Sequence, residues 1–260
     1  SGQIDILAHA LAKGFMHQFK IHRLEFGDVK IFSTPRRIAI LVHNLSSVKP
    51  AQTIESRGPS KTQGFDQQGQ PTKALLGFLH SMNAKLNDLV EITTSKGIWL
   101  AVKTRQPEQP VKALLASMLH EVIKGLSLPK SMRWGIHHFS FLRPVRWILM
   151  LHGQEVIETV VFGIKSDRLT YGHRFYHKET ITINKPPDYE EKLSQAYVIA
   201  DPVQRKKIIE LQAQALVGTN DQVRFNTLNE VVNLVEWPKA ILCQFKPEFR
   251  SEERRVGKEC

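Results

Sequence analysis

The sequence predicts an α+β fold of helices and mainly antiparallel sheets, arranged as two or more packed subdomains. Amphipathic repeats predict helices toward both ends of the chain, and short β-rich runs separated by turn residues predict small sheets. The order of these segments does not follow the strand and helix alternation of a parallel sheet. We expect an α+β subdomain over 1–125, a β-rich subdomain followed by helices over 126–249, and a non-native tail over 250–260.

The first part of the chain predicts a helix and then paired strands. Residues 4–20 repeat apolar side chains at steps of three and four, as on the buried face of a helix. Residues 29–33 and 37–45 are β-rich and are separated by "TPRR", which indicates two paired strands or one strand broken at Pro35. Arg36 and Arg37 would be presented at that break.

Residues 46–125 predict a loop, two helices and a hairpin. "ESRGPSKTQGFDQQGQPTK", residues 55–73, is rich in Gly, Gln, Ser and Pro, which favours a long exposed loop ending at a helix that starts near Pro71. "DLVEITTSKGIWLAVKTR" predicts a hairpin that turns near Lys96 and Gly97. "PVKALLASMLHEVIKGL" predicts a second amphipathic helix.

The remaining pattern is β-rich and then helical. "PVRWILML", "EVIETVVFGI" and "ETITI" predict short strands. Helices are expected over "DYEEKLSQAY", over "PVQRKKIIELQAQALVG" with Asp201 as N-cap, and over "FNTLNEVVNLVEW". Within the second of these helices, "RKK" at 205–207 predicts a solvated face. "AILCQF" predicts a closing strand in which Cys243 is buried.

Composition limits the classes of function. The formal net charge is +11, which favours a polyanionic partner or an acidic subunit surface. Apolar runs are too short to span a bilayer and no secretion signal is visible, so we expect no membrane partner and a cytoplasmic location. The two cysteines, Cys243 and Cys260, cannot form a disulfide framework or a four-thiolate zinc site.

No catalytic residue can be assigned from motifs. The sequence has no glycine-rich phosphate loop and no nucleophile elbow, so we expect no cofactor in this chain. His173 and His177 have the spacing of two metal ligands on a helix, but the Gly- and Tyr-containing segment "GHRFYHK" disfavours that helix. We therefore predict no metal site.

Basic residues at loop edges are the remaining candidates for function. A guanidinium held by a stiff loop suits phosphate recognition, because its planar donors match phosphate oxygens at low entropic cost. For any one arginine, a surface ion pair is the alternative. The candidates for RNA or subunit contact are Arg36, Arg37, Arg57, Lys130, Arg133, Arg143, Arg146, Arg168, His173 and Arg174.

Two tryptophans follow arginines in this set. Trp134 follows Arg133, and Trp147 follows Arg146. Each tryptophan can anchor the core while its arginine points outward, or it can present a face on which a base stacks. We favour the core role, because Trp147 begins an apolar strand.

Several stretches resemble one family in order. These are "FGDVKIFSTPRRIAILVHNL", "RGPS", "FDQQGQPTKALLGF", "KGIWL", "LPKSMRWG", "FLRPVRWILMLHG", "SDRLTYGHRF", "YVIADPVQRKKII" and "EVVNLVEWPKAILCQF". Together they resemble the N-terminal part of the β subunit of the bacterial two-subunit glycyl-tRNA synthetase, over residues 1 to about 249. The family's opening strand and acidic segment, and its HD-type and anticodon-binding regions, are not in this sequence, so we expect a fragment.

The resemblance implies a ligase whose two kinds of subunit have different roles. Its α subunit would carry the class II active site, which uses ATP, magnesium and glycine. The β subunit would recognise tRNA-Gly and complete an α2β2 heterotetramer. This chain would then be a tRNA-recognition and assembly part that is inactive alone. The N-terminal part of the family is also similar to domains of the phenylalanyl-tRNA synthetase β chain, which implies an α+β layout.

Two alternatives stay open. The chain is a structural module that docks on the α subunit without RNA contact, or it is an editing-type hydrolase, as the similarity to phenylalanyl-tRNA synthetase and the polar "YGHRFYH" loop suggest. No nucleophile or base supports the second alternative.

Overall fold

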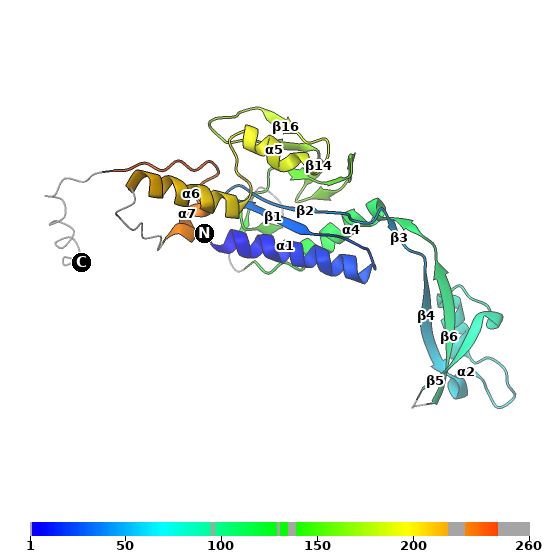
Figure 1. The fold of residues 1–260 in the computed structure, drawn as a ribbon. Coiled ribbons are helices and arrows are strands. Elements are labelled where there is room, and N and C mark those ends of the chain that lie inside the picture. The colour runs from blue at the N-terminus through cyan, green and yellow to red at the C-terminus, as the bar shows by residue number, and fades with distance from the viewer. Residues whose placement is uncertain (1, 95–96, 129–130, 135–138, 218–226, 244–260) are drawn as a thin grey trace, which may run out of the picture. The chain divides into compact units, whose positions relative to one another are not determined.

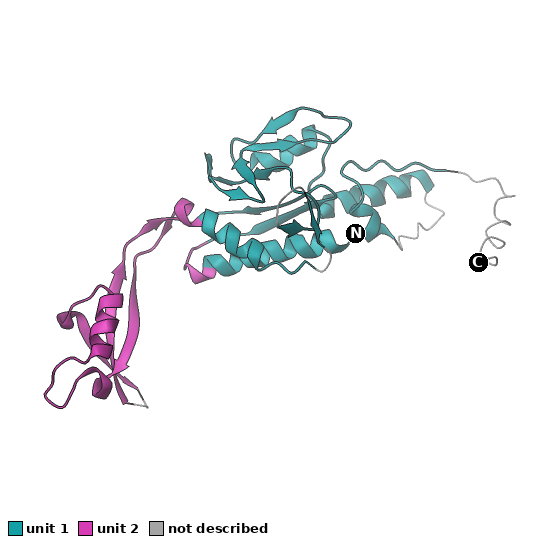
Figure 2. Cartoon of the chain, turned by 180° about the vertical axis from the view of Figure 1, so that it is seen from behind, with its two compact units in different colours: residues 1–19, 26–45, 115–260 teal, residues 20–25, 46–114 magenta. Residues whose placement is uncertain are grey.

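The chain forms two compact units, each containing helices and small sheets. The structure, a computed structural model, describes residues 2–94, 97–128, 131–134, 139–217 and 227–243. Unit 1 is formed by residues 1–19, 26–45 and 115–260, and unit 2 by residues 20–25 and 46–114 (Figure 2). The sheets are mainly antiparallel, which confirms the α+β class. This division follows contacts in space, whereas the linear subdomains expected from the sequence stay a prediction, and the tail over 250–260 lies outside the described residues.

Unit 1 contains most of the helices that the structure describes. These are α1 (Gly2–Ile21), α4 (Val111–Lys124), α5 (Asp188–Gln195), α6 (Pro202–Val217) and α7 (Leu228–Val232), with the last residues of α1 and the first of α4 assigned to unit 2. Its strands are β1 (Val29–Thr34), β2 (Arg37–Val42), β8 (Met132–Arg133), β9 (Ser140–Phe141), β10 (Ile148–Leu149), β11 (Leu151–His152), β12 (Glu155–Val156), β13 (Val160–Val161), β14 (Ile164–Asp167), β15 (Leu169–Tyr171) and β16 (Thr180–Thr182).

The β1–β2 hairpin is central to unit 1. Figure 1 shows it between α1 and the region that holds α5 and β16. The two strands pair antiparallel, with Thr34 opposite Arg37, so Pro35 and Arg36 form the turn. On the helical side, a Cβ added at Gly14 of α1 would lie 2.6 Å from Cγ1 of Val122 in α4. Glycine at this position therefore lets the two helices approach closely.

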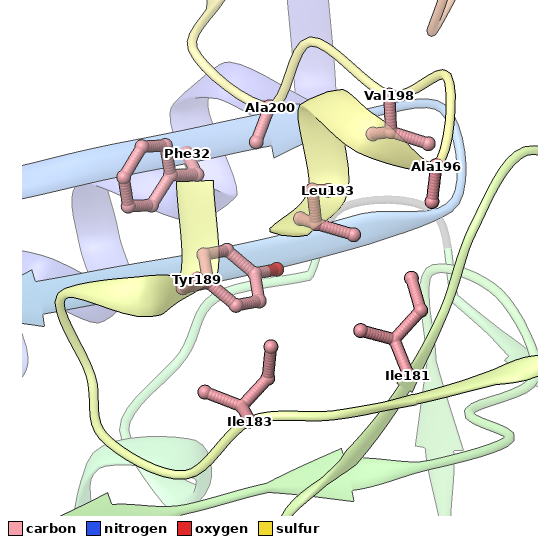
Figure 3. Packing of buried hydrophobic residues seen from close by; sticks show 8 residues of the cluster. All are labelled: Phe32, Ile181, Ile183, Tyr189, Leu193, Ala196, Val198 and Ala200. Atoms are coloured by element: carbon pink, nitrogen blue, oxygen red, sulfur yellow. The ribbon is translucent and has the colours of Figure 1, made fainter. Parts of the chain in front are cut away.

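A hydrophobic cluster joins the hairpin to α5 and β16. Phe32 of β1 is fully buried, and its ring centroid lies 5.5 Å from that of Tyr189 in α5. The full cluster, shown in Figure 3, is Phe32, Ile181, Ile183, Tyr189, Leu193, Ala196, Val198 and Ala200. This packing fixes the segment between α5 and α6 against the hairpin.

Unit 2 is built on a three-stranded antiparallel sheet of order β4-β6-β5. Leu75 and Leu79 of its longest helix pack on Leu100 and Val102 of β6, forming a core of their own. Its elements are β3 (Val48–Lys49), β4 (Gln52–Ser60), α2 (Lys61–Gly64), α3 (Lys73–Ser81), the 3₁₀ turn Leu86–Asp88, β5 (Leu89–Thr94), β6 (Gly97–Gln106) and β7 (Gln109–Pro110).

Most elements expected from periodicity are confirmed. The helices expected over 4–20 and over "PVKALLASMLHEVIKGL" are α1 and α4, and the hairpin that turns before Gly97 is β5–β6. Asp201 caps α6 as expected, since its Oδ1 accepts the backbone N–H of Val203 at 2.8 Å. The helix expected over "FNTLNEVVNLVEW" is shorter in the described residues, where α7 covers Leu228–Val232.

The long loop expected over 55–73 is wrong in its first half. Residues up to Ser60 belong to β4, and α2 follows directly. The pairing of β4 with β6 shifts register between Arg57 and Ser60, so Pro59 sits at an irregularity where its missing N–H is tolerated. Gly58 faces the ring of Phe78, with less than 3 Å for a Cβ. Both residues therefore serve strand packing, although their composition predicted a loop.

The solvated face expected at 205–207 is wrong for its first member. Arg205 is fully buried, whereas Lys207 is exposed. The Arg205 guanidinium donates from Nη1 to the backbone oxygens of Ile199 and Ala200, at 2.7 and 3.0 Å. Its Nε donates to the backbone oxygen of Val232 at 3.1 Å. The guanidinium thus ties α6 to α7 and to the segment before α6.

The closing strand is also wrong. Residues 240–243 form no strand in the structure, and Cys243 is exposed with a free thiol. Ile241 is 80% exposed. An apolar run predicts burial only where a sheet or helix face is present to receive it, and no such face covers these residues within the described part of the chain.

Candidate functional site

The turn of the β1–β2 hairpin holds two of the predicted contact residues. Arg37 is buried: its Nη1 donates to the backbone oxygen of Tyr171 at 2.7 Å and its Nε to Oε1 of Glu236 at 3.1 Å. Thr34 Oγ1 donates to the same carboxylate oxygen at 2.7 Å. The Arg37 charge is therefore neutralised inside unit 1, where it joins the hairpin to the segment after α7.

Arg36 lies beside this ion pair but keeps part of its surface in solvent. Its Nη1 donates to the backbone oxygen of Gly172 at 3.2 Å and lies 3.6 Å from Oε2 of Glu236. Its side chain is 30% exposed. Arg36 is thus held in place and still accessible, which is the arrangement that a phosphate-contacting guanidinium needs.

Trp147 packs against both arginines. The guanidinium carbons of Arg36 and Arg37 lie 6.0 and 5.8 Å from the centroid of its ring, and the ring of Tyr171 lies 5.1 Å away. Trp134 is half-buried as well, 5.8 Å from the ring of Phe162. Both tryptophans therefore contribute to aromatic packing in unit 1, in line with the anchoring role.

The other predicted contact residues differ in how many contacts their side chains make within the chain. Arg168 is half-buried and donates from Nη2 to the backbone oxygen of Gln154 at 3.1 Å. In unit 2, the Arg57 guanidinium lies 3.5 Å from the centroid of the Trp99 ring. Lys130 lies outside the described residues. The exposed members of the set are Arg57, Arg133, Arg143, Arg146 and Arg174.

A row of aromatic rings on the surface was not predicted as a set. The ring of His173 stacks on that of Tyr176, with centroids 4.6 Å apart and planes at 22°. The Tyr176 ring lies 5.5 Å from the Tyr197 ring, which meets the Trp237 ring edge-on at 5.4 Å. We call His173, Tyr176, Tyr197 and Trp237 the aromatic row.

Backbone contacts place the aromatic row. The His173 N–H donates to the backbone oxygen of Ala196 at 2.9 Å, and the His177 N–H donates to the oxygen of His173 at 3.0 Å. A Cβ added at Gly172 would lie 2.8 Å from the Cβ atoms of Ala196 and His177, so the two chain segments meet there because Gly172 has no side chain. Tyr197 adopts a φ of 60°, which turns the chain after α5.

An open pocket adjoins this region. Its volume is about 280 Å³, and its wall includes His177 and Ala196, the immediate neighbours of Tyr176 and Tyr197. Lys192 and Gln195 of α5 add polar groups, and Lys192 Nζ donates to the backbone oxygen of Thr182. The pocket therefore offers both hydrogen-bond donors and hydrogen-bond acceptors beside the aromatic rings.

The side chains whose pKa values are shifted lie outside the aromatic row and the set of predicted contact residues. Burial raises the pKa of Tyr189, and burial lowers the pKa of Arg205. The hydrogen bond to Glu190 raises the pKa of Lys30, and burial with the nearby Lys49 lowers the pKa of His22. Among the described residues, no group of three side chains is placed to hold a metal ion. We assign no catalytic role to any of these groups.

Comparison with known proteins shows the family. A family model described as "Glycyl-tRNA synthetase beta subunit" matches residues 2–251. A glycine–tRNA ligase beta subunit of Hahella chejuensis is 36% identical over 247 residues, covering 94% of this chain and 36% of that protein. The corresponding protein of Xylella fastidiosa strain M12 is 38% identical over 229 residues, covering 87% of this chain and 32% of its own length.

The match extends to a further bacterium. The beta subunit of Desulforamulus reducens is 36% identical over 230 residues, covering 87% of this chain and 33% of that protein. The chain therefore belongs to the family of glycyl-tRNA synthetase beta subunits. It spans about a third of the length of the curated relatives it matches. In the described part, no helix is long and apolar enough to cross a membrane.

Proposed function

We propose that this chain is the tRNA-recognition and assembly part of a glycine–tRNA ligase beta subunit in the cytoplasm. In this proposal an α subunit carries the chemistry and binds ATP and magnesium, and the subunits assemble as α2β2. Two properties of the chain support the proposal: its membership of the beta-subunit family and its net charge of +11. The observation that carries it is the set of exposed arginines, of which Arg143, Arg146 and Arg174 lie in loops.

Arg143 and Arg146 are the best placed members of this set. Both are exposed, they lie between β9 and β10, and Trp147 is packed immediately after them. A packed residue next to an exposed guanidinium restricts its backbone, which lowers the entropic cost of binding a phosphate. Neither guanidinium forms an ion pair with another described residue of the chain.

We expect tRNA-Gly binding to weaken steeply with salt. If several arginines neutralise phosphates, the affinity should fall roughly tenfold or more between about 50 and about 200 mM salt, because counterions are released on binding. Filter binding of tRNA-Gly by the full-length beta subunit assembled with its α subunit measures this. Tight binding that does not depend on salt would exclude phosphate contacts as the main source of affinity.

The Arg143→Ala and Arg146→Ala double variant is expected to weaken binding of tRNA-Gly or of the α subunit without unfolding the chain. If the contact is to RNA, affinity should fall by about tenfold and the logarithmic salt slope by about two, because each arginine neutralises one phosphate. Circular dichroism checks the fold, and filter binding and α-subunit capture separate the two partners.

A matched pair of lysines provides the control for charge alone. Lys165 and Lys207 are exposed and are not in the predicted contact set. Replacing both by alanine removes the same charge. An equal decrease of tRNA binding in the two double variants would show that net charge, and not this loop, governs the affinity. Loss of α-subunit capture with unchanged tRNA binding would favour the purely structural module.

A further inference from the structure

We propose that the aromatic row of unit 1 is a stacking platform for unpaired bases of an RNA strand. This inference rests on the proposed role in tRNA recognition and assigns it a second kind of contact. The arginines would hold the phosphate backbone, and the rings would bind the base faces.

The first argument is exposure. Tyr176 is 64% exposed, and Tyr197 and Trp237 are 42% and 38% exposed. Phe175 beside the row is 75% exposed, and its ring centroid lies 6.1 Å from that of His173. Burying an aromatic side chain away from water is favourable. A contiguous group of exposed rings therefore marks a binding surface.

The second argument is that the rings are fixed before binding. Nδ1 of His173 accepts the backbone N–H groups of Phe175 and Tyr176, at 3.3 and 3.4 Å. The close approach at Gly172 and the left-handed backbone of Tyr197 hold the two segments together. A platform of this kind gives up little conformational entropy when a base stacks on it.

The third argument is charge, which favours RNA over an apolar protein partner. Arg174 lies within the same turn, with its guanidinium carbon 5.8 Å from the Phe175 ring centroid, and it is exposed. Arg36 reaches the turn through its bond to the Gly172 oxygen. Cations at the edge of stacked rings suit a ligand with flat π faces joined by phosphates, as single-stranded RNA is.

The test replaces Tyr176 by alanine in the full-length beta subunit assembled with its α subunit. The probes are tRNA-Gly and an oligoadenylate of about ten nucleotides, a length within the range that single-strand binding sites cover. We expect affinity for both probes to fall roughly fivefold to a hundredfold, the range observed when one stacking ring is removed. The salt slope should stay unchanged, because the variant keeps every phosphate-binding side chain.

Two further variants at the same position separate stacking from apolar contact and from misfolding. Tyr176→Phe keeps the π face and should bind like the parent protein. Tyr176→Leu keeps an apolar side chain without a π face and should bind like the alanine variant. Circular dichroism should be the same for all three, since the side chain is mostly exposed.

The outcomes distinguish the stacking platform from the proposed role in tRNA recognition. Salt-dependent tRNA binding that is unchanged in Tyr176→Ala would overturn the stacking platform and leave tRNA recognition standing. Absence of tRNA binding by the parent assembly would overturn both. Reduced α-subunit capture in Tyr176→Ala, with RNA affinity intact, would assign the row to a protein contact instead.

Discussion

Replacing Arg205 by methionine is expected to lower the free energy of unfolding by about 3 to 5 kcal/mol, because three backbone acceptors lose their donor. The guanidinium is fully buried and donates to three backbone oxygens, two before α6 and one at the end of α7. Methionine fills a similar volume but leaves all three acceptors without their donor, and each buried unsatisfied acceptor costs about 1 to 3 kcal/mol. Urea denaturation of the chain, followed by circular dichroism, measures the decrease.

Lys207→Met on the same helix is the matched control for this prediction. Its side chain is exposed, so the same change should alter stability by no more than about 0.5 kcal/mol. Stability of Arg205→Met equal to that of the parent chain would contradict the structural role of the guanidinium. A decrease as large in Lys207→Met would attribute the effect to helix α6 as a whole.

The burial of Arg205 could not be predicted from its neighbours in the sequence. Asp201 and Pro202 predicted the start of α6 correctly, because an N-cap and a first-turn proline act within a few residues. The burial of Arg205 depends on the Val232 oxygen, 27 positions away. A basic residue among polar ones gives no local sign of such an acceptor, so the charge pattern predicted a solvated face.

The same limit applies to the candidate site. The sequence singled out Arg36 and Arg37 together, yet the turn geometry directs Arg37 inward to Glu236 and leaves Arg36 partly in solvent. Which of two neighbouring arginines is buried depends on the register of the hairpin and on a carboxylate 199 residues after Arg37. Residue type was enough to predict both arginines as contact candidates. Tertiary contacts determine that Arg37 is buried and that Arg36 stays partly exposed.

The aromatic row was only partly visible in the sequence. The segment "YGHRFYH" is polar and aromatic, and His173 and Arg174 were among the predicted contacts. Tyr197 and Trp237 come from two other segments and meet Tyr176 only in the fold. A row assembled from three separate parts of the chain has no spacing that a motif search can detect.

Replacing Glu236 by leucine is expected to lower the free energy of unfolding by about 3 to 5 kcal/mol, because Arg37 is left buried without its counter-charge. Both Nε and Nη2 of Arg37 lie 3.1 Å from Glu236 Oε1, and Thr34 Oγ1 donates to the same oxygen. Glu236→Gln keeps the size and an acceptor oxygen, so it should be less destabilised. Chemical denaturation of the single variants measures both effects.

The double variant Arg37→Met with Glu236→Leu separates the ion pair from packing. With both charges removed, no charge of this pair is left buried without its partner, so the double variant should be more stable than Glu236→Leu alone. Effects that simply add would show that the two residues do not interact energetically. The pair also fixes the backbone next to Trp237, so Glu236→Leu should loosen one end of the aromatic row and weaken oligoadenylate binding.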